Sequence, residues 1–197
     1  MKRINWRILI ITSLLCLLPI CFGFIYYNSV PQEIAIHFDI HNQPNSYLDK
    51  NIVLFLFPIG MMIMQVICCS INDLTKQDKN YKPRIEYVCK SILPIISIVI
   101  YFITLVIALG IELDVRLFVC LILAIIFILI GNYLPKTSSN YNNINKHAVR
   151  TVGHSFVIFG LLLLISLFLS AIYSVIVVGI IIIVMISETI YFYKISH

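Results

Sequence analysis

Hydrophobic residues along the chain fall into long, almost uninterrupted runs, and short polar segments separate these runs. A run of about 20 apolar residues is long enough for an α-helix to cross roughly 30 Å of hydrocarbon. Six runs meet this condition, and we predict membrane spans over Ile8–Tyr27, Ile52–Ile71, Ser91–Gly110, Leu117–Leu134, Val152–Ser170 and Tyr173–Tyr193. The pattern therefore predicts an all-α fold, a polytopic membrane bundle of six transmembrane helices.

The last apolar stretch, Val152–Tyr193, decides between five spans and six. It is about twice as long as one crossing requires, and Ser170, Ala171 and Ser174 allow a tight turn near its middle. We therefore favour two helices here. We treat 1–197 as a single membrane domain, with a first helical hairpin at 1–72 that carries an outer loop at 28–50, and a four-helix region at 91–197.

Composition agrees with a membrane protein. The chain has 60% hydrophobic and 12% charged residues and a mean hydropathy of +0.99, far from the averages of soluble domains. A transmembrane β-barrel would instead show alternating segments of about ten residues. The net charge of +5 comes from basic residues dispersed among short loops, so we expect no direct binding of nucleic acid. The six cysteines form no C-x-x-C pair and lie mostly in apolar runs, which predicts free thiols.

The basic residues are sorted to one side of the membrane if the amino terminus lies in the cytoplasm. The outer segments then hold only Lys50 and Arg116. The inner segments hold the other twelve of the fourteen basic residues: Lys2, Arg3, Arg7, Lys76, Lys79, Lys82, Arg84, Lys90, Lys136, Lys146, Arg150 and Lys194. Such an excess is typical of cytoplasmic loops, so we expect both termini in the cytoplasm.

The longest polar segment outside the spans is Pro31–Lys50. Its apolar and polar residues alternate from Ile34 to Ile40, the period of a half-buried strand. Turn-forming residues follow at 42–46, and we expect a short hairpin or strand over the mouth of the bundle. The candidate recognition residues of this outer loop are Pro31, Ile34, Ile36, His37, Phe38, Asp39, Pro44, Asn45, Tyr47 and Lys50.

Within that segment, His37, Asp39 and His41 are residue types that bind zinc. At about 3.3 Å per residue, however, the two histidines of a strand stand roughly 13 Å apart, too far to share one ion. We therefore favour a solvated strand that faces lipid headgroups, or a surface that recognises a partner, over a metal site.

A carboxylate inside the last predicted span, Glu188, is the second candidate site. Charged groups within a membrane are costly and are usually paired. His154 and Arg150, at the start of the neighbouring span, are predicted to lie at a similar depth. Glu188 is then either a structural tether, a carboxylate that reaches the inner interface, or part of a proton or ion relay.

Catalytic chemistry has no support in the sequence. The chain contains no arrangement of nucleophile and base, no Gly-rich phosphate loop and no H-E-x-x-H motif. Its seven glycines lie mostly in the predicted spans. We expect neither enzyme activity nor a bound cofactor or metal.

Two motifs together resemble those of the Sdp-type immunity proteins. The first is P-x-x-I-x-x-H-F followed by P-N-x-Y-x-x-K within 31–50, similar to a domain of unknown function that often precedes the immunity region. The second is an inner motif formed by Gly131, Asn132, Tyr133, Leu134, Pro135 and Lys136, with Asn140 and Arg150 following it. Pro135 is expected to end its helix, and Lys136 to meet the anionic inner leaflet. The segment 141–149 is shorter than its counterpart in the family.

The resemblance implies a six-span protein of the bacterial plasma membrane that protects its producer from a secreted antimicrobial peptide toxin. It also implies a receptor role, in which toxin binding makes the protein sequester a cytosolic transcriptional repressor. Besides lipid, the implied partners are therefore the toxin and the repressor. Two other functions stay open: a small-solute transporter or channel, and a membrane sensor without an immunity role.

Overall fold

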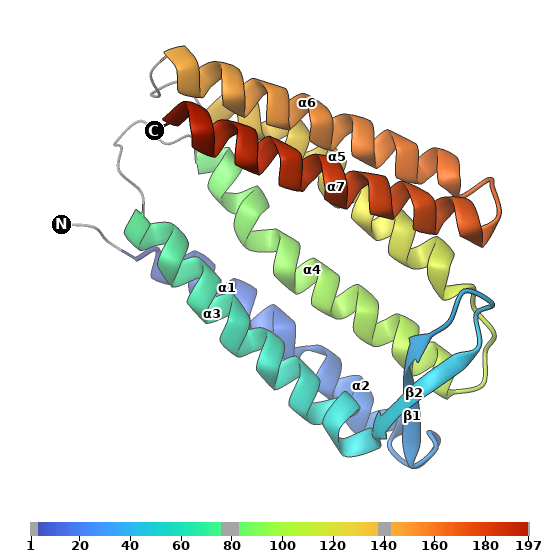
Figure 1. Cartoon of the computed structure of the whole chain (residues 1–197). Helices are drawn as coiled ribbons and strands as arrows, with labels where there is room; N and C mark the ends of the chain where they lie inside the picture. Colours follow the sequence, from blue (N-terminus) through green and yellow to red (C-terminus); the bar gives the residue numbers. More distant parts are fainter. Residues whose placement is uncertain (1–3, 76–82, 138–142, 197) are drawn as a thin grey trace. The chain divides into compact units, whose positions relative to one another are not determined.

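The computed structural model describes residues 4–75, 83–137 and 143–196. Within these residues, six helical segments are long and apolar enough to cross a membrane. They are Trp6–Tyr26, Ile52–Leu74, Tyr87–Ala108, Val115–Pro135, Lys146–Ser166 and Ala171–Tyr191. The prediction of a multi-pass, mostly helical membrane protein is confirmed, and every predicted span overlaps one of these segments (Figure 1).

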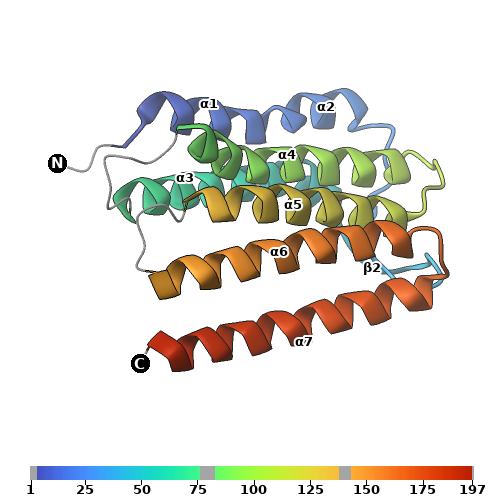
Figure 2. The ribbon, with the colours of Figure 1, turned by 90° about the horizontal axis from the view of Figure 1, so that it is seen from above.

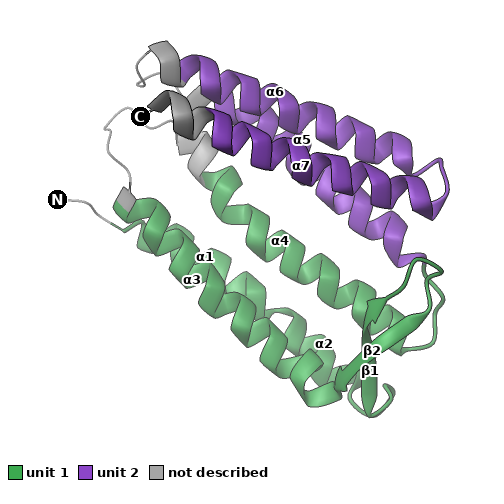
Figure 3. Cartoon of the chain, in the orientation of Figure 1, with its two compact units in different colours: residues 1–113 green, residues 114–197 purple. Residues whose placement is uncertain are grey.

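The chain forms two compact units, residues 1–113 and 114–197 (Figure 3). The sequence grouped the third span with the last three, as one four-helix region at 91–197. In the structure this span is the helix α4 (Pro83–Ala108), and it packs against α1 (Trp6–Leu17) and α3 (Phe57–Thr75) in the first unit. Polar side chains join these three helices, as described below.

Two of the helical rods in the first unit are interrupted at a proline. The first span consists of α1 and α2 (Pro19–Tyr26), which follow one another along one line (Figure 2) and meet at Leu18. The second span begins with a π-helix, η1 (Ile52–Leu56), and continues as α3, with Pro58 in its first turn. Proline lacks an N–H, and its ring crowds the carbonyl four residues earlier. A wider π turn and a helix break both relieve this crowding.

Between these two spans lies an antiparallel β-hairpin, residues 33–49, which we call the β-hairpin. Its strands are β1 (Glu33–Phe38) and β2 (Pro44–Asp49), with Ile34 opposite Leu48 and His37 opposite Ser46. Asn42 in the turn adopts a φ of 60°, a conformation that asparagine tolerates better than most residues. The alternation from Ile34 correctly predicts β1. Of the two predicted forms of this segment, a hairpin or a single strand, the structure contains the hairpin.

The second unit contains α5 (Val115–Thr137), α6 (Asn143–Ser166) and α7 (Ala171–Ser196). Small residues seven apart on α5 and on α6 bring these two helices together. A Cβ added at Gly131 would lie 2.5 Å from the Gly153 carbonyl oxygen, and one added at Gly160 would lie 2.7 Å from the Ala124 carbonyl oxygen. Small residues allow close approach of helices in lipid, where the hydrophobic effect does not drive association.

Candidate functional site

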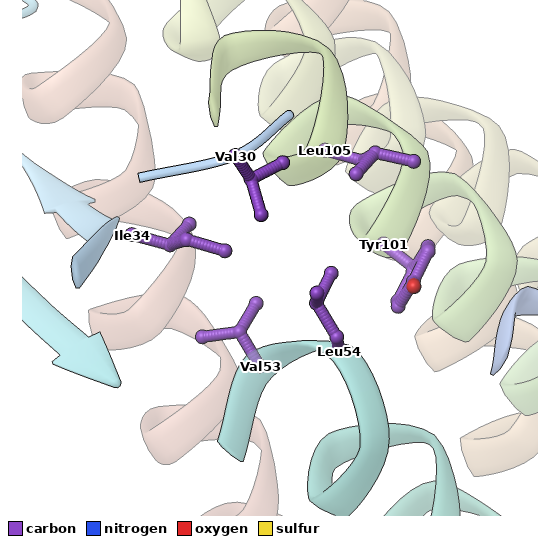
Figure 4. Packing of buried hydrophobic residues seen from close by; sticks show 6 residues of the cluster. All are labelled: Val30, Ile34, Val53, Leu54, Tyr101 and Leu105. Atoms are coloured by element: carbon purple, nitrogen blue, oxygen red, sulfur yellow. The ribbon is translucent and has the colours of Figure 1, made fainter. Parts of the chain in front are cut away.

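A single side chain, that of Ile34, fixes the β-hairpin to the helix ends of the first unit. Ile34 is 1% exposed and belongs to a buried cluster with Val30, Val53, Leu54, Tyr101 and Leu105 (Figure 4). These residues come from the segment after α2, from η1 and from α4, so one strand residue contacts two of the three spans. Burying such a side chain contributes about 1.5–3 kcal/mol.

Polar contacts fix the base of the β-hairpin as well. The Lys50 ammonium lies 4.1 Å from the centroid of the Tyr27 ring and donates a hydrogen bond of 3.3 Å to the Tyr27 carbonyl. The Tyr27 hydroxyl donates to Asn51 Oδ1 at 2.9 Å. Asp49 accepts hydrogen bonds from the backbone and side-chain amides of Asn51 and from the side chain of Gln32. Lys50, a predicted recognition residue, is thus engaged in this anchor.

The turn of the β-hairpin is held by Asp39. Its carboxylate accepts hydrogen bonds from the backbone N–H groups of His41 and Gln43, at 2.8 and 2.9 Å. The backbone N–H of Gln43 is the main cause that lowers the pKa of Asp39, and the backbone N–H of Asn51 does the same to the pKa of Asp49. In the same turn, Asn42 Nδ2 donates to the Leu113 carbonyl at 2.8 Å, which ties the tip to the segment after α4.

The remaining residues of the β-hairpin are largely open to the surroundings. The strand alternation would place Ile34, Ile36, Phe38 and Ile40 on one ridge, but irregular pairing between Ala35 and Phe38 interrupts it. Ile34 is buried, whereas Ile36 and Ile40 are 44% and 55% exposed. The β-hairpin therefore presents apolar side chains outward, among acidic ones. The exposed apolar residues are Ile36, Ile40, Tyr47 and Leu48, and the acidic residues are Glu33, Asp39 and Asp49.

The other predicted residues of this loop lie on its surface. His37 Nδ1 is 2.6 Å from Asn45 Oδ1 across the strands, and both side chains are exposed. Pro31 and Pro44 are exposed next to or within the strands, and Phe38 is partly buried. Eight of the ten predicted outer-loop residues thus lie on the β-hairpin, and Pro31 and Lys50 lie just before and just after it.

The inner motif lies at the end of α5 and the start of α6. Pro135 does not end its helix as predicted, because α5 continues to Thr137. Proline in the last turn forgoes only the bond from its own missing N–H, and a Cβ added at Gly153 would lie 2.6 Å from the Pro135 ring. Gly131 is buried at the same interface, Asn132 and Arg150 are exposed, and Tyr133 and Leu134 are partly buried. The Lys136 side chain and Asn140 lie outside the described residues.

Glu188 has a different partner from the one that the sequence indicated. Its Oε1 accepts a hydrogen bond of 2.5 Å from the Ser155 hydroxyl on α6. His154 and Arg150 are both exposed. On an α-helix, residues 154 and 155 point about 100° apart, so the neighbouring serine, and not the histidine, faces α7.

Sequence reasoning missed a buried polar network between α1, α3 and α4. Lys90 Nζ lies 2.6 Å from Asp73 Oδ1, and both side chains are at most 1% exposed. Gln65 Nε2 donates to Thr12 Oγ1 at 2.8 Å and to the Lys90 carbonyl at 2.7 Å. That carbonyl is four residues before Pro94, which has no N–H to offer it. A proline within a span was the available signal that a neighbouring side chain must serve as donor.

Comparison with known proteins concerns the part of the chain that carries the β-hairpin. Residues 14–62 match a family described as a domain of unknown function, DUF1648. The match begins in the last turn of α1 and ends in the first turns of α3. No curated protein and no solved structure matches the chain. The matched region therefore contains the whole β-hairpin and the adjoining parts of the first two spans.

Proposed function

We propose that this protein is an integral membrane immunity protein, which binds a secreted membrane-active peptide toxin through the β-hairpin and so protects the cell. The observation that carries the proposal is the contrast between Ile34, which is 1% exposed, and two other isoleucines of the β-hairpin, Ile36 on the same strand and Ile40 in the turn, which are 44% and 55% exposed. Ile34 and the polar contacts at the base and the tip hold the element in place, and Ile36 and Ile40 stay exposed to a partner.

Exposed apolar and acidic residues together favour a cationic, amphipathic peptide. Residues 31–49 contain three acidic residues, Glu33, Asp39 and Asp49, and no lysine or arginine. Backbone N–H groups hold the pKa of Asp39 and of Asp49 below the usual value, so both stay charged at neutral pH. Opposite charge raises the rate of encounter, and burial of apolar side chains supplies affinity.

The distribution of basic residues supports the location that this function requires. Only Lys50 and Arg116 of the fourteen basic residues fall on the side of the β-hairpin when the six spans cross alternately. By the positive-inside rule this side is the exterior, where a secreted peptide arrives. Both termini then lie in the cytoplasm of the proposed bacterial host.

A protection assay tests the proposal. The chain is expressed in a bacterial strain sensitive to a membrane-active peptide, and survival is measured across peptide concentrations. We expect protection from the cognate peptide, and its loss in the double variant Ile36→Ala/Ile40→Ala. The matched control is Ile183→Ala on α7, which removes an equally apolar side chain that is 68% exposed. Absence of protection against a panel of such peptides, with the protein present in the membrane, would contradict the proposal.

Signalling to a cytosolic repressor is the second part of this proposal. Asn132 and Arg150, both exposed, lie at the end of α5 and near the start of α6. They are therefore available to a protein on the cytoplasmic side. Co-purification of a transcriptional repressor after peptide addition, and its loss in Arg150→Ala, is the expected result. Protection from the peptide without any bound repressor would contradict the signalling role and leave the proposed immunity role standing.

A small-solute transporter is the competing function, and the buried network around Gln65 favours it. Polar side chains within the membrane often mark a pathway. Gln65 and Thr12 are bonded to each other, however, and Asp73 is paired with Lys90, which is also what a structural network requires. Flux of small solutes or protons into liposomes that contain the protein would favour the transporter.

A further inference from the structure

Two sets of contacts fix the register of the three spans in the first unit. In the first set Thr12, Gln65 and the Lys90 carbonyl are joined by hydrogen bonds. In the second set Gly23 lies against Leu54 and Tyr101. Eleven residues separate the two sets on every span: 12 to 23, 54 to 65 and 90 to 101. Eleven residues are about three turns of a helix, so the three spans keep the same level along this distance.

Ser97 lies between these two sets, at the level of two prolines. It is seven residues beyond Lys90, on the way from the first set to the second set. Seven residues along the other two spans, counted from Thr12 and from Gln65 toward the second set, lead to Pro19 and Pro58. Both prolines are less than 2% exposed, and both accompany irregular backbone, the break at Leu18 and the π-helix η1. At each of these prolines, the carbonyl four residues earlier receives no hydrogen bond from the proline, which has no N–H.

Two buried hydroxyl groups, one at this level and one a helical turn closer to the second set, lack a hydrogen-bond partner among the described residues. Ser97 Oγ and the Tyr101 hydroxyl form no hydrogen bond, although Ser97 is 0% and Tyr101 1% exposed. Four residues separate them on α4, so they lie on one face of that helix, one turn apart. Buried hydroxyls are normally bonded to protein or to ordered water.

A backbone carbonyl lies near the Tyr101 hydroxyl. The point where a Cβ of Gly23 would stand is 2.7 Å from the Tyr101 hydroxyl oxygen and 3.2 Å from the Leu54 carbonyl oxygen. The two oxygens are therefore at most the sum of these distances, 5.9 Å, apart. A water molecule that makes two hydrogen bonds of about 2.8 Å at a roughly tetrahedral angle bridges oxygens about 4.6 Å apart, which lies within this limit. Pro58, four residues after Leu54, has no N–H to donate to that carbonyl.

We propose that internal water binds in the first unit at the level of Ser97 and Tyr101, beside the buried cluster that contains Ile34. Water both donates and accepts, as two hydroxyls and a carbonyl together require. A cation fits this place less well, because the described carboxylate on the neighbouring α3 face, Asp73, lies beyond Gln65 and is paired with Lys90. Two of the residues that would bind this water, Leu54 and Tyr101, belong to the same buried cluster as Ile34 of the β-hairpin.

Radiolytic hydroxyl labelling of the full chain in lipid nanodiscs tests this proposal. Radicals formed from a bound water oxidise the side chain beside it, and mass spectrometry after exposure in ¹⁸O-water reads the incorporated oxygen at each residue. We expect several-fold more label on Tyr101 than on Phe159, an aromatic residue that is 5% exposed in the apolar cluster of the second unit. Equal labelling of Tyr101 and Phe159 would overturn the proposal.

Two serine variants locate the water. Ser97→Ala should lower the label on Tyr101 several-fold, because the water loses one of its hydrogen-bond partners. Ser166→Ala is the matched control: Ser166 is also 0% exposed, but its hydroxyl donates to the Leu163 carbonyl in the second unit. Unchanged Tyr101 labelling in Ser97→Ala would overturn the placement beside Ser97. The readout does not depend on immunity, so it stands or fails separately from the proposed function.

Discussion

Replacing Ile34 with alanine should release the β-hairpin from the helices without unfolding the rest of the first unit. The reason is that Ile34 is the buried side chain of β1, whereas most of the other strand side chains are exposed. Substitution removes three carbon atoms from a place that is 1% exposed. At about 0.8 kcal/mol for each buried methylene-sized group the loss is about 2.4 kcal/mol. A residual cavity raises large-to-small losses to about 2–5 kcal/mol.

We take about 3 kcal/mol as the expected loss of docking free energy. Since about 1.4 kcal/mol corresponds to a tenfold change in an equilibrium constant, the population of the undocked β-hairpin should rise about 100-fold. Hydrogen–deuterium exchange of the amides in 33–49, measured by mass spectrometry in nanodiscs, reports this population. Exchange should accelerate by a similar factor in this segment and stay unchanged in α3 and α4.

Ile36→Ala is the control, because it makes the same chemical change two residues further along the same strand. Ile36 is 44% exposed, so its truncation should change exchange by less than about threefold, the effect of an ordinary surface substitution. Equal acceleration in the two variants would show that Ile34 is not the anchor. Faster exchange throughout the first unit would show that the β-hairpin and the helices unfold together.

Three further predictions concern other contacts. Asp73→Leu or Lys90→Met alone should lower the unfolding free energy by about 3–5 kcal/mol, and the double variant should recover most of it, because an unpaired buried charge costs more than an absent pair; thermal unfolding in detergent distinguishes recovery from an additive loss. Gly153→Ala should lower the unfolding temperature, since the new Cβ would lie 2.6 Å from a proline ring carbon, whereas Gly179→Ala, with open space around it, should not; equal shifts would contradict the role of close packing. Asp39 has a lowered pKa, so its contribution to the docked turn is complete above the unfolded pKa of about 3.9 and is lost as the pH falls through the folded value; the protection of the turn amides, measured relative to their intrinsic exchange rates at each pH, should fall below about pH 4 in the wild type, and this fall should be absent in Asp39→Asn.

Much of the fold follows from hydropathy alone. Runs of about 20 apolar residues located all six spans, because an α-helix of that length crosses the membrane and makes all its backbone hydrogen bonds within the segment. The alternation from Ile34 to Ile40 located β1 for a similar reason, since side chains in a strand alternate between faces. The second strand, 44–49, carries no such alternation, and its pairing with β1 fixes its structure.

Tertiary contacts were harder to predict. Depth along a helix can be estimated from the sequence, which placed Glu188 level with His154, but the rotation of each helix about its axis cannot be estimated in this way. The partner of Glu188 is Ser155, one residue further along α6 than the predicted His154. The pairing of Asp73 with Lys90 required knowledge that α4 packs on α3. Pro94 gave a local signal for a missing donor without revealing that Gln65 supplies it.

The hydrogen bond from Gln65 to the Lys90 carbonyl also bears on the order of assembly. If α4 entered the bilayer alone, the Lys90 carbonyl, four residues before Pro94, would face lipid without a hydrogen-bond donor, at a cost of several kcal/mol. That cost disappears once α3 packs against α4 and the side-chain amide of Gln65 donates to this carbonyl. The two helices are therefore expected to leave the insertion machinery as a pair, and their connecting segment to be made before either settles in the membrane.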